Sequence, residues 1–570
     1  MINFINKLRA RIRKFDKKID EYTKNSEGSL QIPYLAYVNW GINLSQNEDL
    51  ESALEKLETS AIMQPNSPLV HLNLGQIQMK KGLFTEALKS FFKTIRLENT
   101  NGTAYSLISA CYILQNEFKE GENYFKKACK ISPDNSEIYT NYAIALAQKG
   151  KKFKSLEILK QALKLNSKDF LALHYSGLIN CDLAKYEEAL TTLEEAYKIN
   201  QNNPDTLLYL SLCKFKLEKY DEAFLYIEKS LNIRPNYPDS IMIKGIILAK
   251  KGKEAECLSC FSANAKGNEN NFQYYTYWGM ALQIFERYAE AKEKFLQSFE
   301  LNRENELTLY YLAENYEKEG NLTPALHLYT KITEINNNNG VAHEKIGNIL
   351  FKNTDYKGAI KAYFNCIKSS RKHLYLYEKI ASCYYKIDDL KESETYYIKA
   401  IDYNPDLIEA YTGYVNLLIQ KGNYKEALRK IRTAYKKAPN SFEVNNLYSR
   451  LLVKEELYQD ALDKIDKLLE INPEYYEAIL TKAEVYNALK KPKEAIGLLQ
   501  TLPKEYHDTR DFLYISTISY DNLAQLSPSH YNISRALEYC DRLTDKYSNE
   551  YKMESIRQRL EETLKMVEGE

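Results

Sequence analysis

This chain of 570 residues has little glycine, proline or tryptophan, with 20 Gly, 14 Pro and 2 Trp. Few residues interrupt its long stretches rich in Leu, Lys, Glu and Ala, so the composition favours helix. It has no run of 18 or more apolar residues, so no segment is predicted to span a bilayer. Charge of one sign is also missing, because 78 Lys+Arg face 77 Asp+Glu. This balance argues against a general nucleic-acid binder, whose affinity depends on neutralising phosphates.

Cysteine is sparse, and its nine copies are scattered and odd in number, which suits a reducing compartment better than a disulfide framework. We therefore expect a cytoplasmic protein. Cys257 and Cys260 form the single CxxC pair, and no second pair or His–Cys cluster completes a tetrahedral metal site. The seven histidines lack a ligand spacing, and no P-loop, GxGxxG or GxSxG motif occurs. The sequence predicts no enzyme, no cofactor and no metal site.

What the sequence does contain is a repeat. A frame that starts at Tyr34 and advances by 34 residues gives fourteen units without insertion or deletion, over residues 34–509. Position 20 of the unit is small in all fourteen, from Ala53 to Ala495, and position 8 is small in thirteen. Position 24 is large and apolar, as in Phe91 and Phe295. Small residues at positions 8 and 20 allow two antiparallel helices to approach closely, and the large residue fills the space beside that contact.

This pattern resembles the tetratricopeptide repeat family over more than four fifths of the chain. The resemblance implies an all-α fold, an α-solenoid in which stacked antiparallel hairpins form a right-handed superhelix. It also implies that the first helix of each hairpin lines a concave face through positions 2, 5, 6, 9, 12 and 13. Each hairpin has an apolar face that it cannot bury alone, so stacking on its neighbours is obligatory.

Both ends depart from the repeat. We interpret residues 510–548 as a degenerate fifteenth unit with a lengthened turn, and 549–570 as a helix that caps the last apolar face. In this helix Met553, Ile556, Leu560, Leu564 and Val567 share one stripe. Residues 1–33 hold a basic amphipathic helix, over 1–22, and a linker. Three roles remain open for that helix: packing on the first unit or self-pairing, lying on an anionic membrane, or meeting an acidic partner.

Candidate binding residues come from positions 6 and 9 of the first helices. Position 9 is mostly apolar in units one to eight and polar from unit nine onward, while tyrosines occupy position 6 in units five, six, eight and nine. An apolar strip beside aromatic residues is typical of a binding surface, although a tightly wound superhelix also partly buries position 9. The predicted strip consists of Ile144, Tyr175, Leu178, Tyr209, Leu212, Ile246, Tyr277, Met280 and Tyr311.

A second feature is an acidic row at position 2, formed by Glu409, Glu443 and Glu477. A site for a basic ligand and a favourable place in the helix dipole explain this row equally well. Our first hypothesis is a non-catalytic scaffold that binds a segment of a partner protein in its groove. The alternatives are an arm that presents substrates to a separately encoded transferase or assembly machine, and a peripheral membrane adaptor that uses residues 1–22.

Overall fold

A computed structural model describes residues 31–46, 49–547 and 551–569. The secondary structure of this part of the chain is helical and contains no strand, which confirms the predicted all-α fold. The predicted helix over residues 1–22 lies outside the described residues. Contacts divide the chain into two compact units, one up to Asn302 and one from Arg303, and each is described by itself. In the described residues no helix is both long and apolar enough to cross a membrane.

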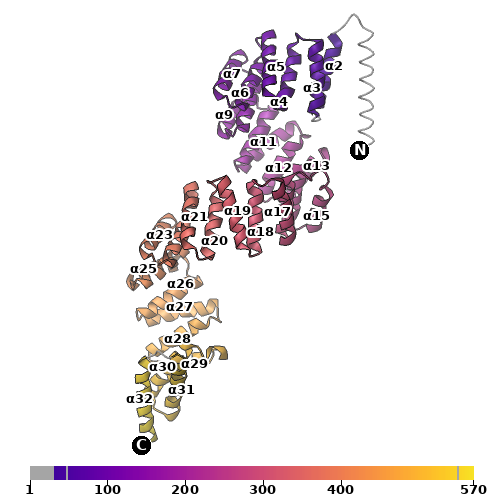
Figure 1. Cartoon of the computed structure of the whole chain (residues 1–570). Coiled ribbons are helices and arrows are strands. Elements are labelled where there is room, and N and C mark those ends of the chain that lie inside the picture. The colour runs from indigo at the N-terminus through magenta and orange to yellow at the C-terminus, as the bar shows by residue number, and fades with distance from the viewer. Residues whose placement is uncertain (1–30, 47–48, 548–550, 570) are drawn as a thin grey trace. The chain divides into compact units, whose positions relative to one another are not determined.

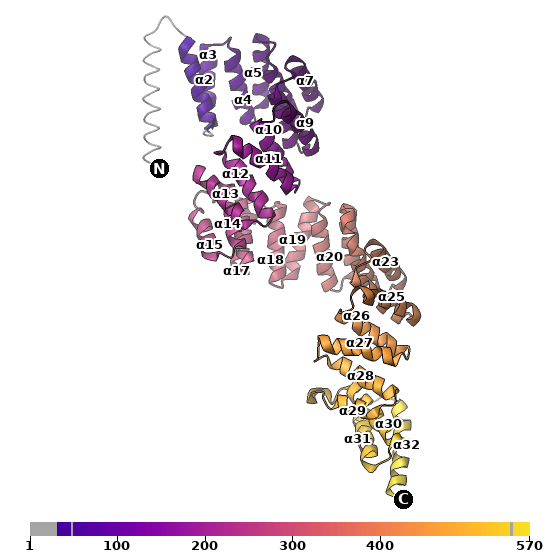
Figure 2. The same cartoon turned by 180° about the vertical axis from the view of Figure 1, so that it is seen from behind.

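The first compact unit is a succession of antiparallel helix pairs (Figures 1 and 2). Its first helices are α2 (Gln31–Gln46), α4 (Pro68–Lys80), α6 (Gly102–Leu114), α8 (Ser136–Gln148), α10 (Phe170–Asp182), α12 (Pro204–Lys216), α14 (Pro238–Lys250) and α16 (Phe272–Ile284). Their partners are α3 (Leu50–Met63), α5 (Phe84–Leu97), α7 (Phe118–Ile131), α9 (Lys152–Leu165), α11 (Tyr186–Ile199), α13 (Tyr220–Ile233), α15 (Glu254–Ala263) and α17 (Tyr288–Leu301).

The second compact unit continues the same alternation. Its first helices are α18 (Glu306–Lys318), α20 (Gly340–Lys352), α22 (Tyr377–Lys386), α24 (Ile408–Gln420), α26 (Phe442–Lys454), α28 (Tyr476–Ala488) and α30 (Arg510–Leu526). Their partners are α19 (Leu322–Ile335), α21 (Tyr356–Ser369), α23 (Leu390–Tyr403), α25 (Tyr424–Lys437), α27 (Tyr458–Ile471), α29 (Pro492–Leu499) and α31 (His530–Lys546). Two 3₁₀ turns, η1 (Arg371–Leu376) and η2 (Lys504–Tyr506), and the final helix α32 (Tyr551–Glu568) complete it.

Within each pair, the residues at positions 8, 20 and 24 make the contact that the sequence predicts. A Cβ atom added to Gly279 at position 8 would lie 2.5 Å from Cε1 of Phe295 at position 24, so the ring occupies the space that the missing side chain leaves. Small polar residues also pack tightly, because they bond across the pair. The hydroxyl of Ser211 donates to the carbonyl oxygen of Ala223 at 2.7 Å.

Among the described residues, thirteen pairs, from α4–α5 to α28–α29, are closed by a turn with a left-handed residue at position 15. Five of these residues are glycines, for example Gly82 with φ 77°. Eight are not glycines: Asn116, Ala184, Glu218, Glu286, Thr354, Asp388, Glu456 and Lys490. This conformation crowds the Cβ atom against the backbone. The packing of the two helices therefore imposes the turn even where the sequence does not favour it.

Most first helices begin with a capping side chain at position 34 of the preceding unit. Asn203 and Asn305 accept hydrogen bonds from the backbone nitrogens of Thr206 and Thr308 at 2.8 and 2.9 Å. Such caps satisfy one of the free N–H groups at a helix start. These caps thus mark where most first helices begin, at a constant interval along the chain.

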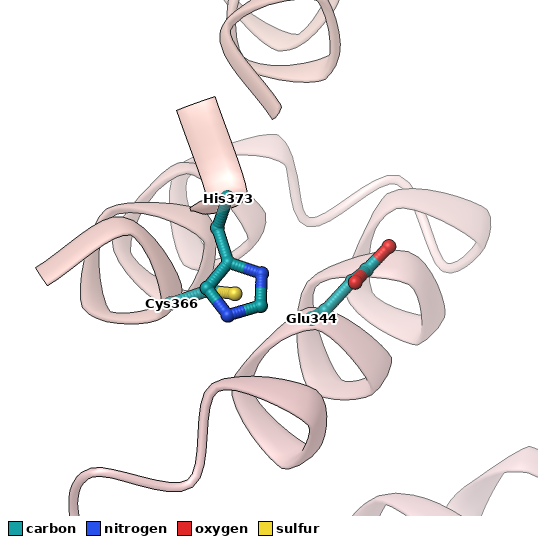
Figure 3. A group of neighbouring side chains, drawn as sticks. All are labelled: Glu344, Cys366 and His373. Atoms are coloured by element: carbon teal, nitrogen blue, oxygen red, sulfur yellow. The ribbon is translucent and has the colours of Figure 1, made fainter. Parts of the chain in front are cut away.

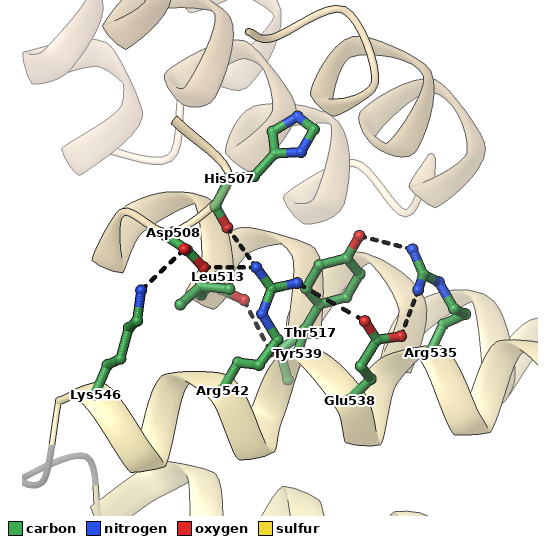
Figure 4. Close-up of polar contacts among 9 residues, drawn as sticks. All are labelled: His507, Asp508, Leu513, Thr517, Arg535, Glu538, Tyr539, Arg542 and Lys546. Carbon is green, nitrogen blue, oxygen red and sulfur yellow. Dashed lines mark hydrogen bonds and ion pairs between the residues drawn. The ribbon is translucent and has the colours of Figure 1, made fainter. Parts of the chain in front are cut away.

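The C-terminal end differs from the expected lengthened turn. The turn between α30 and α31 spans only Ser527 to Ser529, and the extra residues lengthen both helices to 17 residues each. Helix α30 stops because Pro528 cannot continue it, and Ser529 caps α31. Polar contacts hold α31 to the segment before α30 (Figure 4): Arg542 donates to Oδ1 of Asp508 at 2.6 Å, and Lys546 pairs with the same carboxylate.

Helix α32 covers the last apolar face. Met553 and Leu560 are buried, and Ile556 and Leu564 pack against the same core. Val567 departs from the predicted stripe, because it is 41% exposed. The helix runs beyond the end of the surface it covers.

Candidate protein-binding face of the first helices

In the second compact unit, cavities are lined mainly by residues of the first helices. A cavity of about 740 Å³ is lined by residues of α26, α28 and α30 and by Tyr475, which precedes α28. A cavity of about 410 Å³ is lined almost entirely by residues of α18, α20 and α22. These lining residues fall at positions such as 2, 5, 6 and 9 of the repeat. The surface that the tetratricopeptide resemblance implies for binding is therefore hollowed here.

Eight of the nine predicted strip residues are partly exposed on first helices. In the first compact unit, Ile144 lies on α8, Tyr175 and Leu178 on α10, Tyr209 and Leu212 on α12, and Tyr277 and Met280 on α16. Tyr311 lies on α18 and belongs to the second compact unit. Ile246 on α14 differs from the expectation: only 5% of it is exposed, and it packs in the core with Met242 and Phe261.

Burial of Ile246 follows from its neighbours on α14. Ile243, which takes position 6 in place of tyrosine, is also buried and packs with Leu208 and Ile227. On α14 the side chains at positions 6 and 9 thus both pack in the core. The strip of the first compact unit is therefore interrupted at α14, with exposed apolar area on α8, α10 and α12 and again on α16.

The partly exposed side chains also contribute to packing. Leu178, Tyr209 and Leu212 contact the core cluster that contains Leu193 and Leu210. Each side chain thus has one part against the core and one part available to solvent. Position 9 is half-buried on these helices, as expected if a tightly wound superhelix partly buries it. That the strip binds a partner stays a proposal.

Two carboxylates lie among the tyrosines. The hydroxyl of Tyr237 donates to Oδ1 of Asp205 at 2.5 Å. Burial raises the pKa of Tyr209 to about 12, with further contributions from Asp182, Cys181, Asp239 and Asp205. The pKa of Asp239 is raised by surrounding protein and by the charge of Asp205, although its side chain is exposed.

The second compact unit presents a more charged face. Burial raises the pKa of Glu378, and the charges of Glu409 and Glu443 raise it further, against the opposing effect of Lys379. Burial and Asp511 raise the pKa of Glu484 in the same way. The polar residues at position 9 indicated a change of character, but the sequence analysis did not predict the cavities. Their walls combine residues of three successive first helices.

Cys257 occupies a packing slot, as its place at position 20 predicts. Its thiol is buried and donates to the carbonyl oxygen of Gly245 across the helix pair at 3.2 Å. Burial raises its pKa to about 12, so it stays a neutral thiol. Cys260, one turn later, is half-buried against the same pair.

Comparison with known proteins agrees with this helical repeat. Family profiles for the tetratricopeptide repeat match residues 374–407, 415–476 and 452–514. A profile for the C-terminal ARM domain of tetratricopeptide repeat protein 21 matches residues 46–251. The chain is a tetratricopeptide repeat protein. Human tetratricopeptide repeat protein 6 is 28% identical over 118 residues, which is 20% of this chain and 21% of the human protein. The matched part thus spans about a fifth of that relative.

Three solved structures are similar to this tetratricopeptide protein. The APC/C hetero-tetramer Cut9–Hcn1 matches at 13% identity, covering 82% of this chain and 98% of that one, with a TM-score of 0.35. The thermophilic protein TTC0263 of Thermus thermophilus matches at 21% identity, covering 32% of this chain and 99% of that one, with a TM-score of 0.31. Human IFIT1, solved as a dimer with m7Gppp-AAAA, matches at 16% identity, covering 65% of this chain and 90% of that one, with a TM-score of 0.42.

Proposed function

We propose that this tetratricopeptide protein is a non-catalytic scaffold that binds a segment of a partner protein along its first helices. The observation that carries the proposal is the set of partly exposed apolar and tyrosine side chains on α8, α10, α12 and α16. Covering apolar area stabilises a complex by about 25 cal/mol per Å². Tyrosine suits such a surface, since it offers a large rigid area and one polar group.

The partner segment is expected to have spaced apolar anchors. In the first compact unit, Ile144, Tyr175, Leu178, Tyr209 and Leu212 would hold one group of anchors, and Tyr277 and Met280 a second. In the second compact unit, Tyr311 would hold an anchor of its own. Between them α14 offers little apolar area, because Ile246 is buried. The accessory arm and the membrane adaptor stay predictions, and the adaptor rests on residues 1–22, outside the described part of the chain.

A displayed peptide library selected on the full chain tests this proposal. Enriched peptides should carry apolar or aromatic residues separated by polar ones. The triple variant Leu178→Glu, Leu212→Glu, Met280→Glu should bind them about 100-fold or more weakly, because each change removes roughly 1 kcal/mol of apolar contact and introduces a charge.

A control places two glutamates on the second helices instead. Phe153 on α9 and Leu225 on α13 are 70% and 63% exposed, so the double variant Phe153→Glu, Leu225→Glu should bind peptides as the wild type does. Helicity by circular dichroism should be equal in all three proteins. Equal loss of binding in the control, or unfolding of the triple variant, would show that the strip is not a binding surface.

A further inference from the structure

The repeat brings positions 5, 27 and 34 of one unit together. Thr140 at position 5 donates to Oδ2 of Asp169 at position 34 with a distance of 3.1 Å. Three hydrogen-bond pairs in different repeats follow the same rule: Thr140–Asp169 and Asn446–Tyr475 join positions 5 and 34, and Thr276–Ser298 joins positions 5 and 27. The hydroxyls of Thr276 and Ser298 are 2.7 Å apart. The three positions are thus neighbours through the geometry of the helix pair itself.

In unit ten these positions hold Glu344, Cys366 and His373. One ligand atom from each side chain lies within 4.8 Å of the other two, with Cys366 buried and the others half-buried (Figure 3). None of the other thirteen units has metal-ligating side chains at all three positions. The ligands are 22 and 7 residues apart in the chain, so no short sequence motif signals them.

His373 also changes the local backbone. Position 34 is Asn, Asp or Ser in nine units, and it normally caps the next first helix. With histidine there, residues Arg371–Leu376 form the 3₁₀ turn η1, and α22 begins only at Tyr377, without a side-chain cap. The Nδ1 atom of His373 is buried and has no hydrogen-bond partner among the described residues. An unsatisfied buried nitrogen costs about 1–3 kcal/mol, so this position needs an explanation.

We propose that Glu344, Cys366 and His373 bind a zinc ion. Thiolate, imidazole and carboxylate are the zinc ligands of proteins, and bond lengths near 2.0–2.3 Å place tetrahedral ligands roughly 3.3–3.7 Å apart. The three side chains reach this separation by closing about 1 Å. A water molecule completes the tetrahedron. On binding, the Cys366 thiol releases its proton to solvent and its sulfur forms the bond to zinc.

The groups around the site are compatible with replacing the thiol proton of Cys366 by zinc. Glu344 accepts a hydrogen bond from the hydroxyl of Tyr375 and lies 3.6 Å from the Lys379 ammonium. Lys379 also donates to Oδ1 of Asn348 at 2.8 Å, so it keeps a partner when the carboxylate turns to the ion. Without metal, burial and the charge of Glu344 raise the pKa of Cys366 to about 11. Zinc affinity should therefore rise with pH, because the ion displaces a proton.

The test titrates the full chain, stripped of metal under reducing conditions, with Zn²⁺ and with Co²⁺ as a spectroscopic probe. We expect one tight site per chain and a thiolate-to-cobalt charge-transfer band. His373→Asn installs the capping residue of neighbouring repeats, and Cys366→Ser installs the residue that Ser230 and Ser298 supply at position 27. Each should retain helicity yet bind zinc about 100-fold or more weakly, since loss of outer-shell partners alone costs about 10–100-fold. Glu344→Gln should weaken binding in the same direction.

The matched control is Cys257→Ser, Cys260→Ser, which removes the CxxC pair and should leave zinc binding and the cobalt band unchanged. Absence of a thiolate band in the wild type would overturn the proposal. So would wild-type affinity in both His373→Asn and Cys366→Ser, or loss of binding in the CxxC control.

Discussion

Replacing Gly279 with alanine tests the contact that defines the repeat. The new Cβ would lie 2.5, 2.7 and 2.8 Å from three ring atoms of Phe295. Carbon atoms pack at about 3.5–4.0 Å, so the ring must move by about 1 Å. Phe295 is fully buried, so the ring moves against side chains already packed around it. Overpacking of this kind costs about 1–3 kcal/mol, and alanine returns about 1 kcal/mol as the better helix former. The expected net loss reaches about 2 kcal/mol.

Gly497→Ala is the matched control. Gly497 lies inside α29, and an added Cβ there would meet no atom within 4 Å. This change should therefore stabilise its helix by about 1 kcal/mol. Native-state hydrogen exchange is the appropriate assay, because a solenoid couples mainly to neighbouring repeats and need not unfold in one step. Gly279→Ala should lower protection in α16 and α17, whereas Gly497→Ala should raise it in α29.

A compensating variant makes the reasoning refutable. Unit four pairs Ala143 at position 8 with Leu159 at position 24, and both are fully buried. Adding Phe295→Leu to Gly279→Ala recreates that pair and should recover part of the lost protection. If Gly279→Ala alone raises protection as much as Gly497→Ala does, the ring does not require a glycine opposite it, and the proposed basis of the repeat contact is wrong.

Two further predictions follow from the backbone and from a buried base. Ala184 has a left-handed backbone, with φ 58°, so Ala184→Gly should stabilise the turn between α10 and α11 by about 1 kcal/mol. Amide hydrogen exchange in that turn should become slower, and faster exchange would contradict the prediction. Burial lowers the pKa of His174 to about 4, and its Nδ1 lies 2.9 Å from the Thr206 hydroxyl. In the unfolded chain the imidazole protonates near pH 6.5, so between pH 6.5 and 4 the unfolded state binds more protons than the folded state. Lowering the pH over that range should therefore reduce the local free energy of unfolding by about 3 kcal/mol. His174→Gln should remove most of this acid sensitivity in α10 and α12, and an unchanged pH profile would show that other groups cause it.

The sequence alone determined the architecture. A period of 34 residues with small residues at fixed positions specifies where two helices touch, because a side chain at Gly279 would meet the ring of Phe295. Capping residues such as Asn305 likewise mark where first helices begin. These signals are local or repeat at a constant interval, so they can be read without coordinates.

Tertiary structure decided which side chains stay accessible. Ile246 and Met280 occupy the same position of the repeat, yet Ile246 packs in the core with Met242 and Phe261, whereas Met280 is partly exposed. Eight non-glycine turn residues accept left-handed backbones because the helix packing they close outweighs their own preference. The approach of Glu344, Cys366 and His373 depends on the fold as well, because their separations of 22 and 7 residues become short distances only when α20, α21 and η1 pack together.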